Sequence, residues 1–127
     1  MIKAIYQNAW PYQQDKLNLP VKDLATALPF YETKMNFTID SRKDTPIKTA
    51  QLSRDNIRIG LAENGGDPEQ DGCFFEVDDV EKAFSELLSN GIKISKPGMT
   101  KHGENTWKVF YVVAPDGLCY CIGQKQI

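Results

Sequence analysis

The sequence is poor in the features of disulfide-framed, membrane-spanning and nucleic-acid-binding proteins. It has three cysteines, Cys73, Cys119 and Cys121, and this small odd number argues against a disulfide framework. No apolar run approaches the roughly 20 residues needed to cross a bilayer. The 15 Lys and Arg residues are scattered and are outnumbered by 17 Asp and Glu residues. No cationic surplus therefore favours nucleic acid or an acidic membrane as a partner.

The opening segment also lacks the pattern of a secretory signal peptide. Its first ten residues contain one lysine and no continuous apolar stretch. We therefore expect a cytoplasmic protein. Residues 1–14 mix Ile, Tyr and Trp with polar residues, which is compatible with an extra strand or with a dimer arm.

What is present indicates one α+β domain over residues 1–127. The chain is 41% hydrophobic and 25% charged, values typical of a globular domain with one main core. Apolar alternation predicts strands, and helical spacing after Asp23 predicts a helix capped by that residue. Pro20 lacks a donor, so its strand should be an edge or bulged. The elements expected in this half are strands at 17–21, 37–39, 47–52 and 57–61 and a helix from 23 to about 34.

After a Gly-, Pro- and acid-rich linker at 64–71, the same pattern begins again. Asp78 or Asp79 should cap a helix whose apolar stripe runs from Val80 to Leu88 and which ends at Gly91. The strands expected here are 73–77, 92–94, 107–113 and 118–122, with a polar loop at 96–105. Aligning Val21 with Val77 matches Asp23 with Asp79. An internal duplication follows, with module one at about 14–63 and module two at about 72–124.

Three stretches resemble the vicinal oxygen chelate superfamily of glyoxalase I, bleomycin-resistance proteins and extradiol dioxygenases. They are LPVKDLATALPFYETKMNF, FFEVDDVEKAFSELLSNGIKI and FYVVAPDGLCYCIGQ. The resemblance implies two βαβββ modules whose curved sheets form a cup. It also implies a homodimer, with modules paired within a chain or swapped between chains.

Enzymes of that superfamily hold a divalent metal with four inward side chains, and the resemblance carries these positions onto this sequence. The matching residues are Lys16, Gly72, Cys121 and either Arg58 or Gly60. One thiolate does not hold a hard divalent ion. We therefore expect no metal and no cofactor. Among members of the superfamily, the sequence then most resembles the metal-free, bleomycin-resistance-type proteins, which bind a drug and catalyse no reaction.

Strand alternation indicates which side chains would face the cup and bind a small molecule. They are Lys16, Asn18, Arg58, Phe74, Glu76, Trp107, Cys119 and Cys121. Leu17 and Leu19 would instead pack on the helices. The two cations suit an anionic or oxygen-rich ligand, and Trp107 suits stacking on a planar ring.

Each of these assignments has an alternative. Lys16, Arg58 and Glu76 can satisfy one another across the cup, and the two cysteines can be small buried residues. An enzyme, a lyase or a dioxygenase, would need a metal held unusually through Glu63, Glu76, Cys121 or His102. A structural dimer with a collapsed cup is the third possibility. The leading hypothesis is a cytoplasmic, metal-free small-molecule-binding homodimer.

Overall fold

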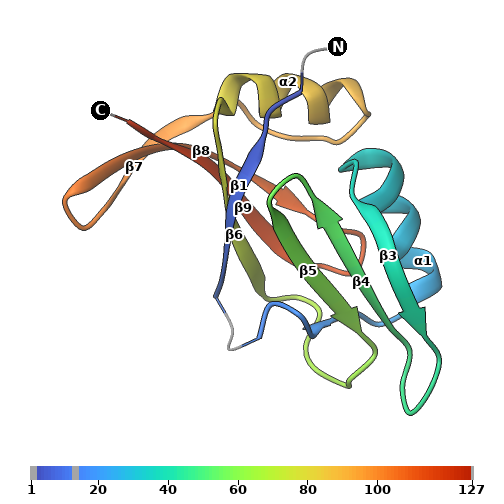
Figure 1. Cartoon of the computed structure of the whole chain (residues 1–127). Coiled ribbons are helices and arrows are strands. Elements are labelled where there is room, and N and C mark those ends of the chain that lie inside the picture. Colours follow the sequence, from blue (N-terminus) through green and yellow to red (C-terminus); the bar gives the residue numbers. More distant parts are fainter. Residues whose placement is uncertain (1–2, 13–14, 127) are drawn as a thin grey trace.

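The computed structural model describes residues 3–12 and 15–126. Both ends of the predicted opening segment, residues 1–2 and 13–14, therefore lie outside the described residues. Its strands form two sheets (Figure 1). Sheet A has the order β1-β6-β9-β8-β7, and sheet B has the order β2-β5-β4-β3. The elements are β1 (Tyr6–Pro11), β2 (Leu19–Pro20), α1 (Leu24–Pro29), η1 (Phe30–Lys34), β3 (Thr38–Lys43), β4 (Thr49–Arg54), β5 (Ile57–Ala62), β6 (Asp71–Val77), α2 (Val80–Ser89), β7 (Gly98–His102), β8 (Asn105–Val113) and β9 (Cys119–Gln126).

The two sheets repeat one topology. In sheet B the first strand, β2, pairs in parallel with the last strand, β5, and β4 and β3 follow antiparallel. In sheet A β6 pairs in parallel with β9, and β8 and β7 follow antiparallel. Each set is a strand, a helix and three strands, which confirms the predicted α+β fold of two βαβββ modules. The predicted limits of the modules and of the linker at 64–71 stay a prediction.

The helices begin where the acidic caps predict. The Asp23 side chain accepts a hydrogen bond from the Ala25 amide at the start of α1. The Asp79 side chain accepts from the Glu81 and Lys82 amides at the start of α2. Pro29 has no N–H to donate, and after it the helix widens into the π-helical turn η1. Among the helices of residues 3–12 and 15–126, none is long and apolar enough to span a membrane.

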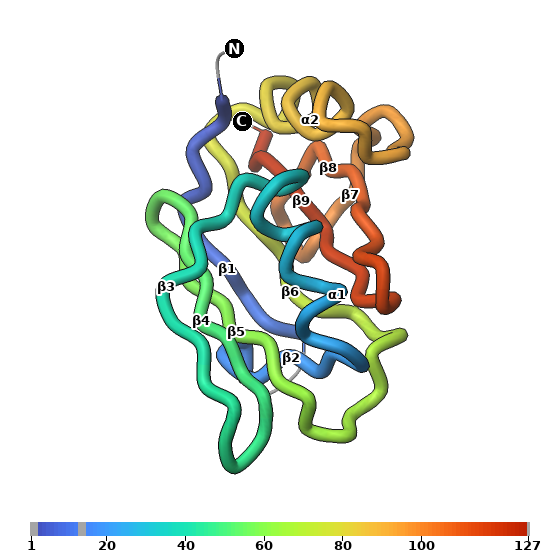
Figure 2. The backbone as a smooth tube through the Cα atoms, turned by 90° about the vertical axis from the view of Figure 1, so that its right-hand side faces the viewer, coloured from blue at the N-terminus to red at the C-terminus, as the bar shows by residue number. Residues whose placement is uncertain are grey.

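One hydrophobic core joins the inner faces of both sheets to both helices. α1 lies in front of the strands in the view of Figure 2, beyond β3 in Figure 1, and α2 packs on β8 and β9. Phe75 of β6 stacks on Tyr120 of β9 at 5.1 Å, and the Tyr120 hydroxyl is 2.5 Å from that of Tyr31 in η1. The predicted alternation is confirmed here, because Cys73, Phe75 and Val77 are all buried in this core.

A buried ion pair joins sheet B to α2. Arg54 of β4 and Glu86 of α2 lie 2.6 Å apart, although each is almost fully buried. The Asn36 amide also donates to Glu86, and Arg54 donates to the Met35 carbonyl. Glu86 lies beside the apolar stripe predicted for this helix and is buried with it, whereas Leu88 at the end of the stripe is half exposed rather than core.

Three predicted elements are wrong. The strand expected at 17–21 contains only Leu19 and Pro20, because the Asp15 side chain accepts from the Leu17 amide and folds residues 15–18 into a turn. No strand forms at 92–94, since the Ile92 amide still donates to Leu87 and closes the end of α2. The polar loop expected at 96–105 contains β7, which pairs with β8.

Candidate functional site

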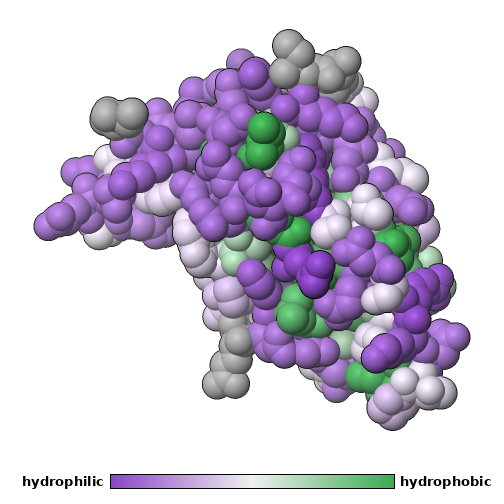
Figure 3. All heavy atoms as spheres, in the orientation of Figure 1, coloured by the Kyte–Doolittle hydropathy of each residue, from purple (hydrophilic) through white to green (hydrophobic). Residues whose placement is uncertain are grey.

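The outer face of sheet A, which points away from the core, carries a group of aromatic side chains. We call it the open face. The alternation that buries Phe75 and Tyr120 turns their neighbours Phe74 and Cys121 outward. Several of its large side chains are 46–61% exposed: Trp10, Tyr12, Tyr111 and Val113. By contrast, the hydrophobic residues on the side drawn in Figure 3 form separate small patches in a hydrophilic surface.

Strand register brings the aromatic residues together. Trp10 of β1 lies opposite Phe74 of β6, and Phe74 lies opposite Cys121 of β9. Trp107 of β8 stands edge-on to Phe74, with ring centroids 5.1 Å apart and planes at 81°. Trp10 lies 5.8 Å from Phe74 and 6.3 Å from Trp107. Rings from three strands therefore meet above one point of the sheet.

Gly123 makes this meeting possible. It pairs with Glu76 on one side and Val109 on the other, directly beneath the Phe74 ring. A Cβ atom here would lie 2.8 Å from Phe74 Cζ and 2.7 Å from Val109 Cγ1. Both distances are shorter than van der Waals contact, so the missing side chain lets Phe74 lie across the sheet and reach Trp107.

Two adjoining cavities open on this face. The first, which we call the aromatic pocket, has a volume of about 200 Å³ and is lined by Trp10, Tyr12, Phe74, His102 and Trp107. The second, the thiol pocket, measures about 160 Å³ and is lined by Tyr12, Asp71, Tyr111, Cys119 and Cys121. Tyr12 lines both, so the two cavities are neighbours on one surface.

The thiols of this surface are weak nucleophiles at neutral pH. Burial raises the pKa of Cys121 to about 11. Burial, followed by the nearby Asp71 carboxylate, also raises the pKa of Cys119. Since the thiolate is the reactive form, both cysteines act as apolar wall rather than as reacting groups.

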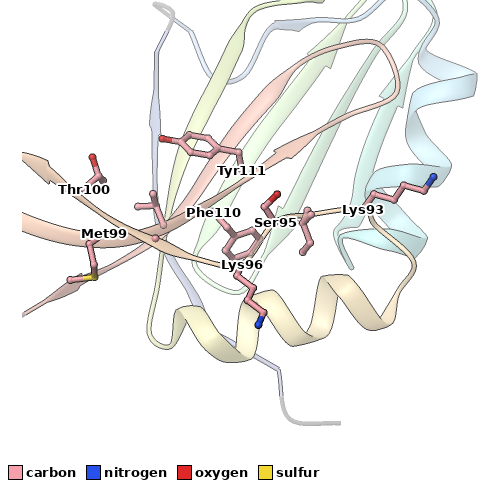
Figure 4. A pocket seen from close by; sticks show the side chains of 10 residues that line it. Lys93, Ser95, Lys96, Met99, Thr100, Phe110 and Tyr111 are labelled. Atoms are coloured by element: carbon pink, nitrogen blue, oxygen red, sulfur yellow. The ribbon is translucent and has the colours of Figure 1, made fainter.

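A wider groove of about 690 Å³ lies between β8 and the segment that follows α2 (Figure 4). Its labelled side chains point in different directions: Lys93 to the right, Lys96 downward and Tyr111 to the left in this view. Ligand sites need a few polar groups that converge on the ligand. The groove lacks that convergence, and the aromatic pocket is the better candidate.

The structure groups five of the eight predicted site residues on the open face. They are Phe74, Glu76, Trp107, Cys119 and Cys121. Glu76 Oε1 accepts a hydrogen bond of 2.6 Å from the Asn8 side chain on the neighbouring strand β1. Their assignment to ligand binding stays a prediction.

The other three predicted residues lie elsewhere. Lys16 and Asn18 sit in the turn before β2, where Lys16 Nζ is 3.3 Å from the Ala9 carbonyl and Asn18 donates to Asp15. Arg58 is exposed on the outer face of sheet B, opposite Ser53. In the part of the chain that the structure describes, Lys16, Arg58 and Glu76 form no salt bridge with one another.

Sequence reasoning did not assign Trp10, Tyr12 or Tyr111 to the site, and it named His102 only as a possible metal ligand of the enzyme alternative. Trp10 and Tyr12 belong to the opening segment, which carries no strong strand pattern. Tyr111 lies four residues after Trp107 in the same strand, so the alternation that predicts an outward Trp107 also predicts an outward Tyr111. His102 was expected in a loop, but β7 brings its ring within 6.2 Å of the Phe74 ring.

These features define a class: an α+β protein of two βαβββ modules with an aromatic, solvent-open sheet face. The chain belongs to the Glyoxalase/Bleomycin resistance protein/Dioxygenase superfamily, whose family model matches residues 13–118. No curated protein matches the chain.

Solved structures share the fold. A bleomycin resistance determinant encoded on the transposon Tn5 is 24% identical, with a TM-score of 0.72 over 91% of this chain and 99% of that one. A bleomycin-binding protein complexed with bleomycin is 23% identical, with a TM-score of 0.70 over 90% and 99%. TnmS3, an antibiotic binding protein from Streptomyces sp. CB03234, is 20% identical, with a TM-score of 0.68 over 90% and 97%.

The residues that the sequence resemblance assigns to the metal positions do not suit a divalent ion. Lys16 is an ammonium group, and Gly72 has no side chain, its Cα facing the Tyr120 ring. Cys121 is a thiol that burial keeps protonated. Across residues 3–12 and 15–126, no group of three or more His, Cys, Asp and Glu side chains is placed to hold a metal. No catalytic step through a metal follows from this donor set.

Proposed function

We propose that this protein binds a small molecule without a metal and holds it on the open face of sheet A. The observation that carries the proposal is the aromatic pocket, in which Trp10, Phe74 and Trp107 meet at a solvent-open cavity. Soluble proteins rarely leave large aromatic side chains clustered at their surface unless the surface binds something. Similar folds named as bleomycin-binding and antibiotic-binding support this class of function.

The proposal includes a homodimer that acts in the cytoplasm. A partner chain would close over the open face and turn it into a cup, contributing Lys16, Asn18 and Arg58 from its own sheet B side. The exposure of Trp10, Tyr12, Tyr111 and Val113 on one face supports this arrangement. The three cysteines are all free thiols, which is usual in a reducing compartment. Sedimentation velocity measures the oligomeric state, and a monomer at micromolar concentration would contradict the dimer.

The binding function is tested by thermal shift with a panel of planar aromatic compounds. A ligand that binds the folded state raises the melting temperature by mass action. The shift should disappear in Trp107→Ala, which removes one wall of the pocket. It should persist in Met99→Ala, which removes an exposed apolar side chain of the same sheet, outside the two cavities of the open face. Equal shifts in both variants would place the ligand elsewhere.

The metal-free part of the proposal has a separate test. Protein purified without a chelator is analysed for bound metals by mass spectrometry. Less than a tenth of an equivalent of any divalent metal is the expected result. Stoichiometric Zn, Ni, Mn or Fe would overturn it and favour a glyoxalase-like lyase or dioxygenase with an unusual metal site.

A further inference from the structure

We propose that the aromatic pocket is a cage for an organic cation, and that the ligand enters it with a quaternary ammonium or similar compact cationic group. This inference rests on the proposed binding function and names the chemistry of the group that is bound there.

The first argument is the arrangement of the rings. Trp107 stands at 81° to Phe74 and at 84° to Trp10, whereas Trp10 and Phe74 are inclined by only 31°. Trp107 is thus nearly perpendicular to both Phe74 and Trp10, and all three rings line the same cavity. Ring faces carry negative charge density, and several faces around one volume attract a cation.

The second argument is the size of the cavity. Its volume is about 200 Å³. Pockets that enclose a whole drug-sized molecule measure roughly 300–1,000 Å³. The aromatic pocket therefore suits one compact group of a ligand, while the rest of the molecule lies across the open face.

The third argument is the chemistry of the walls. Every residue that the structure describes as lining the cavity has an aromatic ring, and Tyr12 is one of them. An anion would need convergent Lys or Arg donors, and the described residues that line this cavity include none. The Lys16 and Arg58 side chains that a partner chain is proposed to contribute would meet the rest of the ligand, outside the aromatic pocket. Charged groups elsewhere on this face include both signs: Glu76 lies two residues from Phe74, Lys125 lies opposite Trp107, and Asp71 lines the adjoining thiol pocket. None of these charged groups lines the aromatic pocket, so its rings decide the preference.

The sequence provides its own reporter for the test. It contains two tryptophans, Trp10 and Trp107, and both line the pocket. Intrinsic tryptophan fluorescence of the intact protein therefore reports on this site alone. The probes are choline and the neutral alcohol in which a tert-butyl group replaces the trimethylammonium group, titrated at equal ionic strength. The two have nearly the same shape and differ in charge.

Choline should bind about tenfold more tightly than the neutral alcohol, the difference expected for a cation held by several ring faces. Equal affinities would overturn the cage. If planar neutral compounds still shift the melting temperature while choline does not bind, the inference fails and the proposed binding function stands. If neither class of compound binds, both fail.

Two variants of one residue separate cation binding from simple packing. Trp107→Leu keeps an apolar wall but removes the ring face, and Trp107→Phe keeps a smaller ring face; Trp10 remains as the reporter in both. The preference for choline should vanish in the Leu variant and survive, reduced, in the Phe variant. An unchanged preference in Trp107→Leu would contradict the proposal. Met99→Ala, outside the cage, should behave like the parent protein.

Discussion

At the scale of single residues, Gly123 sets the shape of the open face, and its replacement is a sharp test. In Gly123→Ala the new methyl group would meet Phe74 and Val109 at 2.8 Å and 2.7 Å. Overpacking of this kind costs about 1–3 kcal/mol of unfolding free energy. Urea denaturation should show this loss, and tryptophan fluorescence should shift because Phe74 is pushed toward Trp107.

Gly98→Ala is the matched control, since a Cβ atom there meets nothing within 4 Å. Gly98 is also in a strand of sheet A, so the backbone effect of adding a methyl group is similar. Its stability should be unchanged or slightly higher, because alanine restricts the unfolded chain. Equal stabilities for the two variants would mean that Phe74 does not lie over Gly123.

Predictions for single residues were correct where the two-residue alternation of a strand alone decides which face a side chain lies on. Alternation places Phe74 and Cys121 on the face opposite Phe75 and Tyr120, and the structure agrees. It could not show that Trp10 lies opposite Phe74, because cross-strand partners depend on register between distant segments. The aromatic pocket can therefore be predicted only in part. Strand alternation predicts that Phe74 of β6 and Trp107 of β8 face outward, but it does not predict that Trp10 of β1 joins them.

At the scale of elements, the acidic caps predict where the helices start, and Asp79 offers the test. Its side chain accepts from two amides, those of Glu81 and Lys82. Asp79→Ala leaves these donors without that partner and should lower stability by about 1 kcal/mol in chemical denaturation. Asp79→Asn keeps a side-chain acceptor and should lower the unfolding free energy by at most about 0.3 kcal/mol. Ser85→Ala, exposed on the same helix, is the control; a loss as large there would remove the capping explanation.

The elements that sequence reasoning misplaced are governed by contacts outside their own pattern. Leu17 belongs to an alternating run, but the turn closed by Asp15 leaves it 38% exposed. The polar residues of β7 give no strand period, and their pairing with β8 supplies the strand. In the first case a local side-chain hydrogen bond competes with the strand, and in the second the strand is set by pairing with another segment.

At the scale of the whole molecule, one shared core explains why the predicted site divides. The inner faces of both sheets pack on the same helices, so their outer faces carry separate sets of side chains. Phe74 and Trp107 lie on one outer face, and Arg58 lies on the other. The sequence period identifies outward residues but not which sheet carries them. A single site that contains outward side chains of both sheet A and sheet B would therefore require the proposed second chain.

The shared core and the floor of the open face together hold several buried groups that ionise at high pH, and this gives a prediction for the intact protein. Burial raises the pKa of Cys73 to about 12 and that of Cys121 to about 11. Burial also raises the pKa values of Tyr31 and Tyr120 well above the ordinary range. In the unfolded chain the pKa is about 8.5 for these thiols and about 10 for these phenols.

Below about pH 8.5 both states keep these protons, so their contribution to stability is fully present. Above it the unfolded state loses protons that the folded state retains, and the unfolding free energy falls by up to about 1.4 kcal/mol per pH unit for each such group. The loss continues until the pH passes the folded pKa of each thiol. Urea denaturation at about pH 8 and about pH 10.5 measures it. Phenolate absorbance is followed in the double variant Tyr12→Phe/Tyr111→Phe, whose remaining tyrosines, Tyr6, Tyr31 and Tyr120, are fully buried. It should appear together with unfolding; constant stability, or phenolate in this folded variant, would contradict the buried core described here.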